Sequence, residues 1–546
     1  MIAQMKSPVQ FFCRLTMFAA TLLLLTSCGG SGGGSSSGSA GSDPPPGPPP
    51  VLSATDVDNI VHAAVEAVNV PVEVAVTDRQ GNILGVFGTN NAPATGMGNF
   101  GTTPDAPNLA VALARTASFF SNNQAPLSSR TVRYISGIHF PPGVAGTSNA
   151  ALYGIENTNR GCSFNANYLP GKAIPPATMI NGSSPGLGVI TGKANVFDSV
   201  PFAVNPGGVP LFENNTLVGG VGVVAADVNV AEYAAYVAAT LPPFGPTPAP
   251  PGVVVINGVS LPFVNNTTPP AGITAGSFNG SYLVSPVAGP GPVPDGYLVG
   301  PNASAYPNGL SQQDVMNVVN AAVDTAHLER AVIRLPIGTR AEFNIAVSDL
   351  DGNLLAIYRM PDATIFSNDV SVAKARNVIY FSSMGGELPG VYADPNPGSV
   401  DLPGVPPGTS VTNRTISFGA QPLYPPGIDG SGNGPFFSLY TLDTANPCTQ
   451  GTQPANMYQN GIVFFPGALA LYRNGVMVGG LGVSGDGVDQ DDFDTAAGAA
   501  EMVLTDSSDP AQTGVGFEAP TAIRADQIVI RNVRLPYIKF PRNPEQ

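Results

Sequence analysis

An internal repeat constrains the fold of this chain more than any other feature. Six blocks of residues recur in the same order, and one of them is the glycine-rich VGGVGVV at 218–224, which matches VGGLGVS at 478–484. The other five pairs are 52–69 with 310–327, 76–84 with 347–355, 113–122 with 374–383, 130–143 with 414–427, and 254–263 with 528–537. Self-similarity in a fixed order indicates repeated structural units, so the sequence predicts two tandem copies of one domain.

Each copy has the pattern of an α+β unit. Ser53 and Ser311 are N-cap candidates, each with an aspartate three residues later, and apolar residues follow at helical spacing. Alternating segments flank Asp-x-x-Gly-Asn, Asn214-Asn215 and Asn474-Gly475, which predicts two β-hairpins in each copy. Further helices are predicted over 109–121, 230–239, 370–383 and 491–504. The order αββαββα favours an antiparallel sheet covered by helices.

The N-terminal residues predict a lipid anchor. Basic Lys6 and Arg14 precede an apolar stretch that ends in Leu25-Thr26-Ser27-Cys28, as in a secretory signal sequence. A cysteine at the cleavage point resembles the bacterial lipobox, so removal of residues 1–27 and diacylation of Cys28 are expected. The stretch is shorter than the roughly 20 residues of a membrane span. Gly29 after the cysteine resembles outer-membrane lipoproteins, on either the periplasmic or the cell-surface face.

Composition places the domain boundaries. Residues 28–51 are a Gly/Ser/Pro linker that cannot bury a core. The first domain is predicted over 52–265 with a long inserted loop at 122–208, and a Pro/Gly linker follows over 266–309. The second domain is predicted over 310–546 with an inserted loop at 384–467. These loops exceed ordinary connections of roughly four to six residues, and the motifs that they share favour an ordered structure.

Charge and motif content exclude several functions. The net charge is −15, and removal of residues 1–27 takes away Lys6 and Arg14 and no acid, which leaves −17. Nucleic acid requires a basic surface, so no nucleic-acid partner is expected. Metal-site, Walker-loop and nucleophile-elbow motifs are absent from the sequence. The acids between Asp486 and Asp494 lack the calcium-loop pattern and suit the start of a helix.

Two cysteines occupy equivalent places in the two copies. Cys162 ends LYGIENTNRGC and Cys448 ends LYTLDTANPC. An even pair in an oxidising compartment indicates a bridge, and equivalent residues can meet on a pseudo-twofold axis between the copies. We therefore predict a Cys162–Cys448 disulfide that joins the inserted loops. Two separate free thiols are the alternative.

The second copy resembles a known family. DLDGNLLAIYRMPDA at 349–363, SVAKARNVIYFSS at 371–383 and YRNGVMVGGLGVSGDGVDQDDFDTAAGA at 472–499 are similar to the GlcG/HbpS family, also called PduO C-terminal-like or haem-binding. Copy one departs from it, because Leu113 stands in place of Lys374 and FGTNNA in place of the RMPDA segment. The resemblance implies two tandem profilin-like α+β domains. Each is expected to have an antiparallel sheet of about five strands with helices on both faces, and the two to form a pseudo-dimer.

The same resemblance implies haem or a related tetrapyrrole as ligand, and homo-oligomers as a further possibility. Haem iron takes His, Cys, Met or Tyr ligands. Candidate cofactor contacts in copy two are Met360, Lys374 and Arg376, since the two cations suit propionates. The alternative is that Arg376 and Arg115 form structural ion pairs with aspartates of the neighbouring hairpin.

The three histidines carry less weight as ligands. His62, His139 and His327 have Asn320, Leu423 and Asn69 as counterparts, so no histidine is present in both copies. A surface or capping role is the simpler interpretation of each.

Three functions follow from these patterns. The first is an envelope lipoprotein of the haem-binding type that acts without catalysis, held at the membrane by its lipid. The second is a ligand-free envelope scaffold whose inserted loops bind another protein. The third is a haem-degrading enzyme, and it is the weakest because no paired acid and base stand out on matching motifs.

Overall fold

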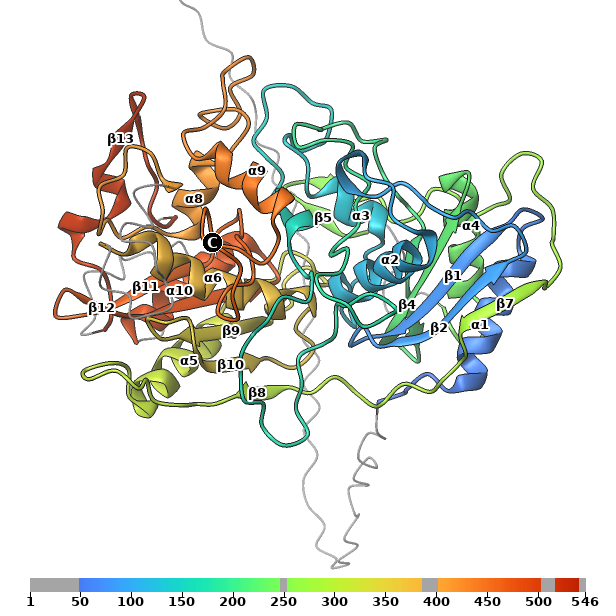
Figure 1. Cartoon of the computed structure of the whole chain (residues 1–546), viewed down its shortest axis with the longest axis horizontal. Helices are drawn as coiled ribbons and strands as arrows, with labels where there is room; N and C mark the ends of the chain where they lie inside the picture. The colour runs from blue at the N-terminus through green and yellow to red at the C-terminus, as the bar shows by residue number, and fades with distance from the viewer. Residues whose placement is uncertain (1–48, 246–252, 385–400, 502–515, 540–546) are drawn as a thin grey trace, which may run out of the picture. The chain divides into compact units, whose positions relative to one another are not determined.

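Two five-stranded sheets with equivalent spatial strand orders organise the chain (Figure 1). The computed structural model describes residues 49–245, 253–384, 401–501 and 516–539. The predicted signal sequence, Cys28 and the first linker up to residue 48 therefore lie outside the described residues. The strand order is β3-β4-β1-β2-β7 in copy one and β11-β12-β9-β10-β8 in copy two, and all the neighbouring strands are antiparallel. The predicted pair of tandem five-stranded α+β domains is confirmed.

Most elements follow one another in the same order in both copies, but the edge strand comes last in copy one (β7) and first in copy two (β8), and α9 has no counterpart α-helix in the described residues of copy one. Copy one contains α1 (Ala54–Glu66), β1 (Val72–Asp78), β2 (Ile83–Thr89), α2 (Ala106–Phe120), α3 (Ser129–Tyr134), β3 (Gly208–Glu213), β4 (Thr216–Ala225), α4 (Val228–Ala239), β5 (Val255–Ile256), β6 (Val259–Ser260) and β7 (Gly280–Val284). Copy two contains β8 (Gly296–Val299), α5 (Gln312–Ala326), β9 (Phe343–Ser348), β10 (Leu354–Arg359), α6 (Phe366–Ser382), α8 (Asn413–Gly419), α9 (Phe437–Ala445), β11 (Ala468–Arg473), β12 (Val476–Gly485), α10 (Val488–Ala500), β13 (Val529–Ile530) and β14 (Val533–Arg534).

Local signals place the predicted elements. Ser53 and Ser311 each accept a hydrogen bond from the backbone N–H three residues on, and the aspartate there completes a capping box. Asn214, Asn215 and Asn474 have φ values of 50°, 63° and 53°, as the hairpin turns require. The predicted last helix of copy two ends at Ala500 rather than at residue 504, because Glu501 adopts a left-handed C-cap conformation.

Helices cover both faces of each sheet. In copy one, Ala75, Val86 and Val224 pack against α2, while Val74, Val76 and the alternate residues of β4 pack against α1 and α4. In copy two, Ala346 and Ile357 pack against α6, and Ile345 and Val347 pack on the side of α5. In the described residues, no helix is both long and apolar enough to cross a membrane.

The segment 266–309, predicted as a linker, also supplies the fifth strand of each sheet. β7 pairs with β2 of copy one, and β8 pairs with β10 of copy two. The alternating apolar residues in this segment are few and stand among prolines and glycines, so the sequence did not predict strands here. The strands form because each sheet has an open edge whose backbone groups need partners.

A shared core joins the two copies. Phe120, at the end of α2, stacks on Phe366, at the start of α6, with ring centroids 4.1 Å apart. Leu127 and Ile155 of copy one and Val463 and Phe465 of copy two belong to the same buried cluster. The inserted loops therefore contribute to the packing between the copies.

Candidate functional site

The three residues predicted to contact a cofactor are all buried. Met360 follows β10 and has no exposed surface. Its Sδ accepts a hydrogen bond from the backbone N–H of Phe343 at 3.4 Å. Met360 is therefore a core side chain, held in place between β10 and β9.

Lys374 lies on α6 with its ammonium group inside copy two. Nζ donates to Asp491 Oδ2 at 2.8 Å and to the carbonyl of Val483 at 2.7 Å, and it lies 5.0 Å from the ring centroid of Phe465. Burial lowers the pKa of Lys374, and the charge of Asp491 opposes that effect. Burial likewise raises the pKa of Asp491 to about 7, against the influence of Lys374.

Two further carboxyl groups, which the sequence did not single out, adjoin this ion pair. Glu329 follows α5 and Asp494 lies on α10, and both are fully buried. All four of their carboxyl oxygens lack a hydrogen-bond partner. Burial raises the pKa of both groups well above the ordinary range. The negative charge of Asp491 raises the pKa of both groups further, and the proximity of Glu329 and Asp494 to each other has the same effect. The arrangement thus favours protonated carboxyls beside one ion pair.

Copy one replaces the charged members of this cluster with apolar residues. Leu113 stands where copy two has Lys374, and Ala231 and Ala234 of α4 correspond to Asp491 and Asp494 of α10. The same fold is thus built without the charges. Since burying charges is costly and apolar replacements are often neutral or stabilising, the cluster is not needed for the fold. This comparison of copies is the sequence signal that could have identified Asp491 and Asp494.

Arg376 holds a turn and an inserted loop together. Its Nε donates to the carbonyl of Gly352 in the β9–β10 turn at 3.0 Å, and its Nη atoms reach the carbonyls of Ser163 and Phe164 of copy one. In copy one, Arg115 Nε donates to Gly81 of the equivalent turn at 2.9 Å. The hairpin aspartates expected as ion-pair partners accept instead from the asparagines of their own turns. Both arginines therefore have structural roles.

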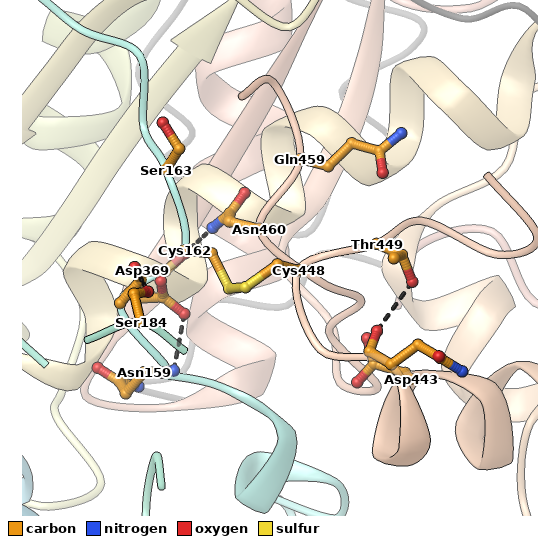
Figure 2. The surroundings of a disulfide bond; sticks show 12 residues. Asn159, Cys162, Ser163, Ser184, Asp369, Asp443, Cys448, Thr449, Gln459 and Asn460 are labelled. Carbon is orange, nitrogen blue, oxygen red and sulfur yellow. Dashed lines mark hydrogen bonds between the residues drawn. A yellow bond between two sulfur atoms is a disulfide. The ribbon is translucent and has the colours of Figure 1, made fainter. Parts of the chain in front are cut away.

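The predicted disulfide links the inserted loops. Cys162 and Cys448 are bonded, with their Cα atoms 5.4 Å apart (Figure 2). Tyr153 and Tyr440, also at equivalent positions, stack with centroids 4.8 Å apart. Equivalent residues therefore meet between the copies, as expected around a pseudo-twofold axis.

A second buried ion pair lies near this junction. Lys193 Nζ is 3.4 Å from Glu156 Oε1, 3.3 Å from the hydroxyl of Tyr440 and 4.6 Å from the ring centroid of Tyr153. All four residues are almost completely buried. Lys193 has no matching cation in the repeat, so sequence reasoning gave no signal for it.

The histidines lie apart from these clusters. His62 is half-exposed on α1 and stacks on Phe278 with ring centroids 3.5 Å apart. His139 lies in the first inserted loop, with Nδ1 3.0 Å from the carbonyl of Thr147. His327 is the C-cap of α5 and is exposed. The structure brings none of them to Met360, Lys374 or Arg376.

Five cavities of the described residues do not form a haem pocket around the predicted contacts. Ligand sites generally occupy about 300–1,000 Å³, whereas four of these cavities measure about 180, 10, 180 and 110 Å³. The fifth, of about 380 Å³, is lined by residues such as Asn69, Thr89 and Ser277 and by no His, Cys, Met or Tyr. Neither Met360, Lys374 nor Arg376 lines any of the five, so the predicted residues do not fit a haem site. In the described part of the chain, no group of three or more His, Cys, Asp and Glu side chains has metal-binding geometry.

Comparison with known proteins relates copy two to a family. A family model described as "Haem degrading protein HbpS-like" matches residues 310–500. Two similar solved structures are a PduOC–haem complex (20% identity, TM-score 0.22, covering 36% of this chain and 95% of that chain) and Klebsiella pneumoniae protein ORFY (18%, 0.22, 36% and 91%). No curated protein matches the chain. Residues 310–500 are therefore similar to the HbpS-like (GlcG/HbpS) family.

Proposed function

We propose that the chain is a lipid-anchored envelope protein of the haem-binding HbpS-like type that acts without catalysis. The match of residues 310–500 to the HbpS-like family supports this proposal most directly. Because Met360, Lys374 and Arg376 are buried, the proposal puts a tetrapyrrole elsewhere on the protein and not among these side chains.

Haem titration of the mature protein tests the ligand. We expect a shifted Soret band that saturates at micromolar haem. Met360→Leu should give the same titration curve, because Sδ is inside the core. The absence of a spectral shift at micromolar haem would count against the proposal. Release of iron or biliverdin would instead support the haem-degrading enzyme.

Cys28 is the proposed anchor, and the outer membrane is the proposed location. Cells grown with labelled palmitate should yield labelled protein, and Cys28→Ser should abolish the label and release the protein from the membrane fraction. Digestion of intact cells with protease would then distinguish the cell-surface face from the periplasmic face. Palmitate labelling that persists in Cys28→Ser would contradict the anchor.

A scaffold function is the second candidate, and exposed apolar residues of the inserted loops favour it. Val144, Phe197, Phe202 and Ile428 are 47%, 49%, 82% and 54% exposed. The segments of Val144 and Ile428 contact each other, since Gly146 N–H donates to Asp429 at 2.7 Å. A photo-crosslinking residue at position 202 should trap one envelope protein reproducibly, and the same residue at exposed position 324 should not.

A further inference from the structure

A cavity of about 180 Å³ lies where an inserted loop of copy one meets copy two. Phe119 at the end of α2, the loop residues 159–178, and Ile365, Asn368 and Asp369 at the start of α6 line it. The loop belongs to the first inserted segment, so both copies contribute to the lining. A cavity of about 150 Å³ is large enough to hold benzene, so this one accommodates a single ring.

About half of the lining is apolar. Phe119, Phe164, Ile174, Pro175, Pro176 and Ile365 contribute side chains. Tyr168 also lines the cavity and is 40% exposed, which places part of the lining at the molecular surface. Such a wall favours an aromatic or aliphatic ring, and aromatic faces also favour a cation.

The polar part of the lining includes two neighbouring hydrogen-bond acceptors, Asp369 and Asn368. Asp369 is 7% exposed, and its Oδ2 accepts from the backbone N–H of Asn159 at 2.8 Å, as Figure 2 shows. Next to it, Asn368 is 2% exposed and its Oδ1 has no hydrogen-bond partner. A buried acceptor without a partner is costly, so a donor supplied by a ligand would be favourable here.

Asp369 has no ion-pair partner within the described residues. The nearest guanidinium groups, Arg160 and Arg376, donate to other acceptors: Arg160 to the carbonyl of Glu156, and Arg376 to Gly352, Ser163 and Phe164. Both influence the carboxyl only through space. The cavity therefore combines an apolar wall with a carboxylate that a cation can bind through a charge-assisted hydrogen bond.

We propose that this cavity binds a small organic cation whose ammonium or amidinium group donates to Asp369 and Asn368 while a single ring contacts Phe119, Phe164 and Ile365. The proposal assigns a role to the first inserted loop that is independent of haem binding.

Benzamidine is the probe for a titration of the full mature chain by calorimetry, with benzyl alcohol and benzoate for comparison. We expect benzamidine to bind, benzyl alcohol to bind more weakly, and benzoate not to bind. Asp369→Asn should lower benzamidine affinity at least about tenfold, since it removes the charge and keeps an acceptor for Asn159. Asp324→Asn, at an exposed position on α5, is the matched control and should bind like the wild type.

A second variant separates binding from folding. Ala177→Leu fills the cavity from the loop side and should also weaken benzamidine binding, while its unfolding midpoint reports the fold. The proposal is overturned if benzamidine does not bind at up to about 10 mM, if Asp369→Asn binds it with wild-type affinity, or if benzoate binds equally well.

Discussion

At the scale of single residues, the buried charges distinguish the two copies. Lys374 and Asp491 form an ion pair inside copy two, and Asp494 lies near them on the same helix as Asp491. Copy one builds the same layers with Leu113 and alanines. The fold forms with either apolar residues or buried charges at these positions, so it does not require the buried charges, which are costly. The charged cluster is therefore a functional candidate of copy two.

Lys374→Leu tests this comparison. The single substitution leaves Asp491 buried without its cation, and breaking a buried pair costs about 3–5 kcal/mol. Lys374→Leu/Asp491→Ala/Asp494→Ala, which reproduces the residues of copy one, should recover most of that loss. Urea unfolding midpoints measure both effects. A triple variant less stable than the single variant would show that copy two needs the charges to fold.

The pH dependence of stability should follow from buried carboxyls such as Asp443. Burial raises the pKa of Asp443 to about 8, compared with about 3.9 in the unfolded chain. The folded state thus binds the proton more tightly, so this contribution is fully present below pH ~4 and is lost as pH rises towards 8.

We therefore expect unfolding midpoints of the wild type to fall between pH 5 and pH 8. The side chain at position 443 does not titrate in Asp443→Asn. The free energy of unfolding of this variant should therefore fall less steeply with pH than that of the wild type, by about 1 kcal/mol per pH unit. Asp324→Asn, at an exposed position, serves as the control with an unchanged slope. Equal slopes for Asp443→Asn and the wild type would contradict this assignment.

At the scale of elements, the repeated glycine-rich block sets how closely a helix approaches its sheet. A Cβ at Gly222 of β4 would overlap the carbonyl oxygen of Ala110 on α2, and one at Gly482 of β12 would overlap that of Ser371 on α6. Glycine is therefore required at both positions for close packing and not for a special φ angle.

Gly482→Ala should destabilise the protein by about 1–3 kcal/mol or more, because overpacking forces α6 away from β12. Gly432→Ala is the control, since nothing lies within 4 Å of its added Cβ and its φ is not positive. Thermal unfolding followed by circular dichroism gives both values. Equal melting temperatures for the two variants would refute the close-packing role.

At the scale of the whole molecule, the inserted loops connect the two copies. The disulfide, the Tyr153–Tyr440 stack and the Phe120–Phe366 stack all join residues of different copies. The described residues from 49 onward accordingly form one compact unit.

Removal of the disulfide in Cys162→Ser/Cys448→Ser should lower the free energy of unfolding by about 2–5 kcal/mol. The reason is that the bond restricts the unfolded chain by closing a long loop, and the variant's unfolded chain regains that conformational entropy. The far-UV circular dichroism should not change, since the shared apolar core is intact. Reductant should destabilise the wild type and leave the double variant unaffected. A double variant as stable as the wild type would mean that the packing alone joins the copies.

The sequence alone determined the duplication, the caps at Ser53 and Ser311 and the hairpin turns, because each depends on local chemistry or on the repeat itself. The repeat also favoured the Cys162–Cys448 pairing, and the structure decided it against two free thiols. Tertiary structure decided which side chains are buried and what they face. It placed Met360 and Arg376 in structural roles, gave each sheet an edge strand from 266–309, and brought Asp369 to a cavity formed by the other copy. These outcomes depend on contacts between residues far apart in the chain, and no local pattern encodes such contacts.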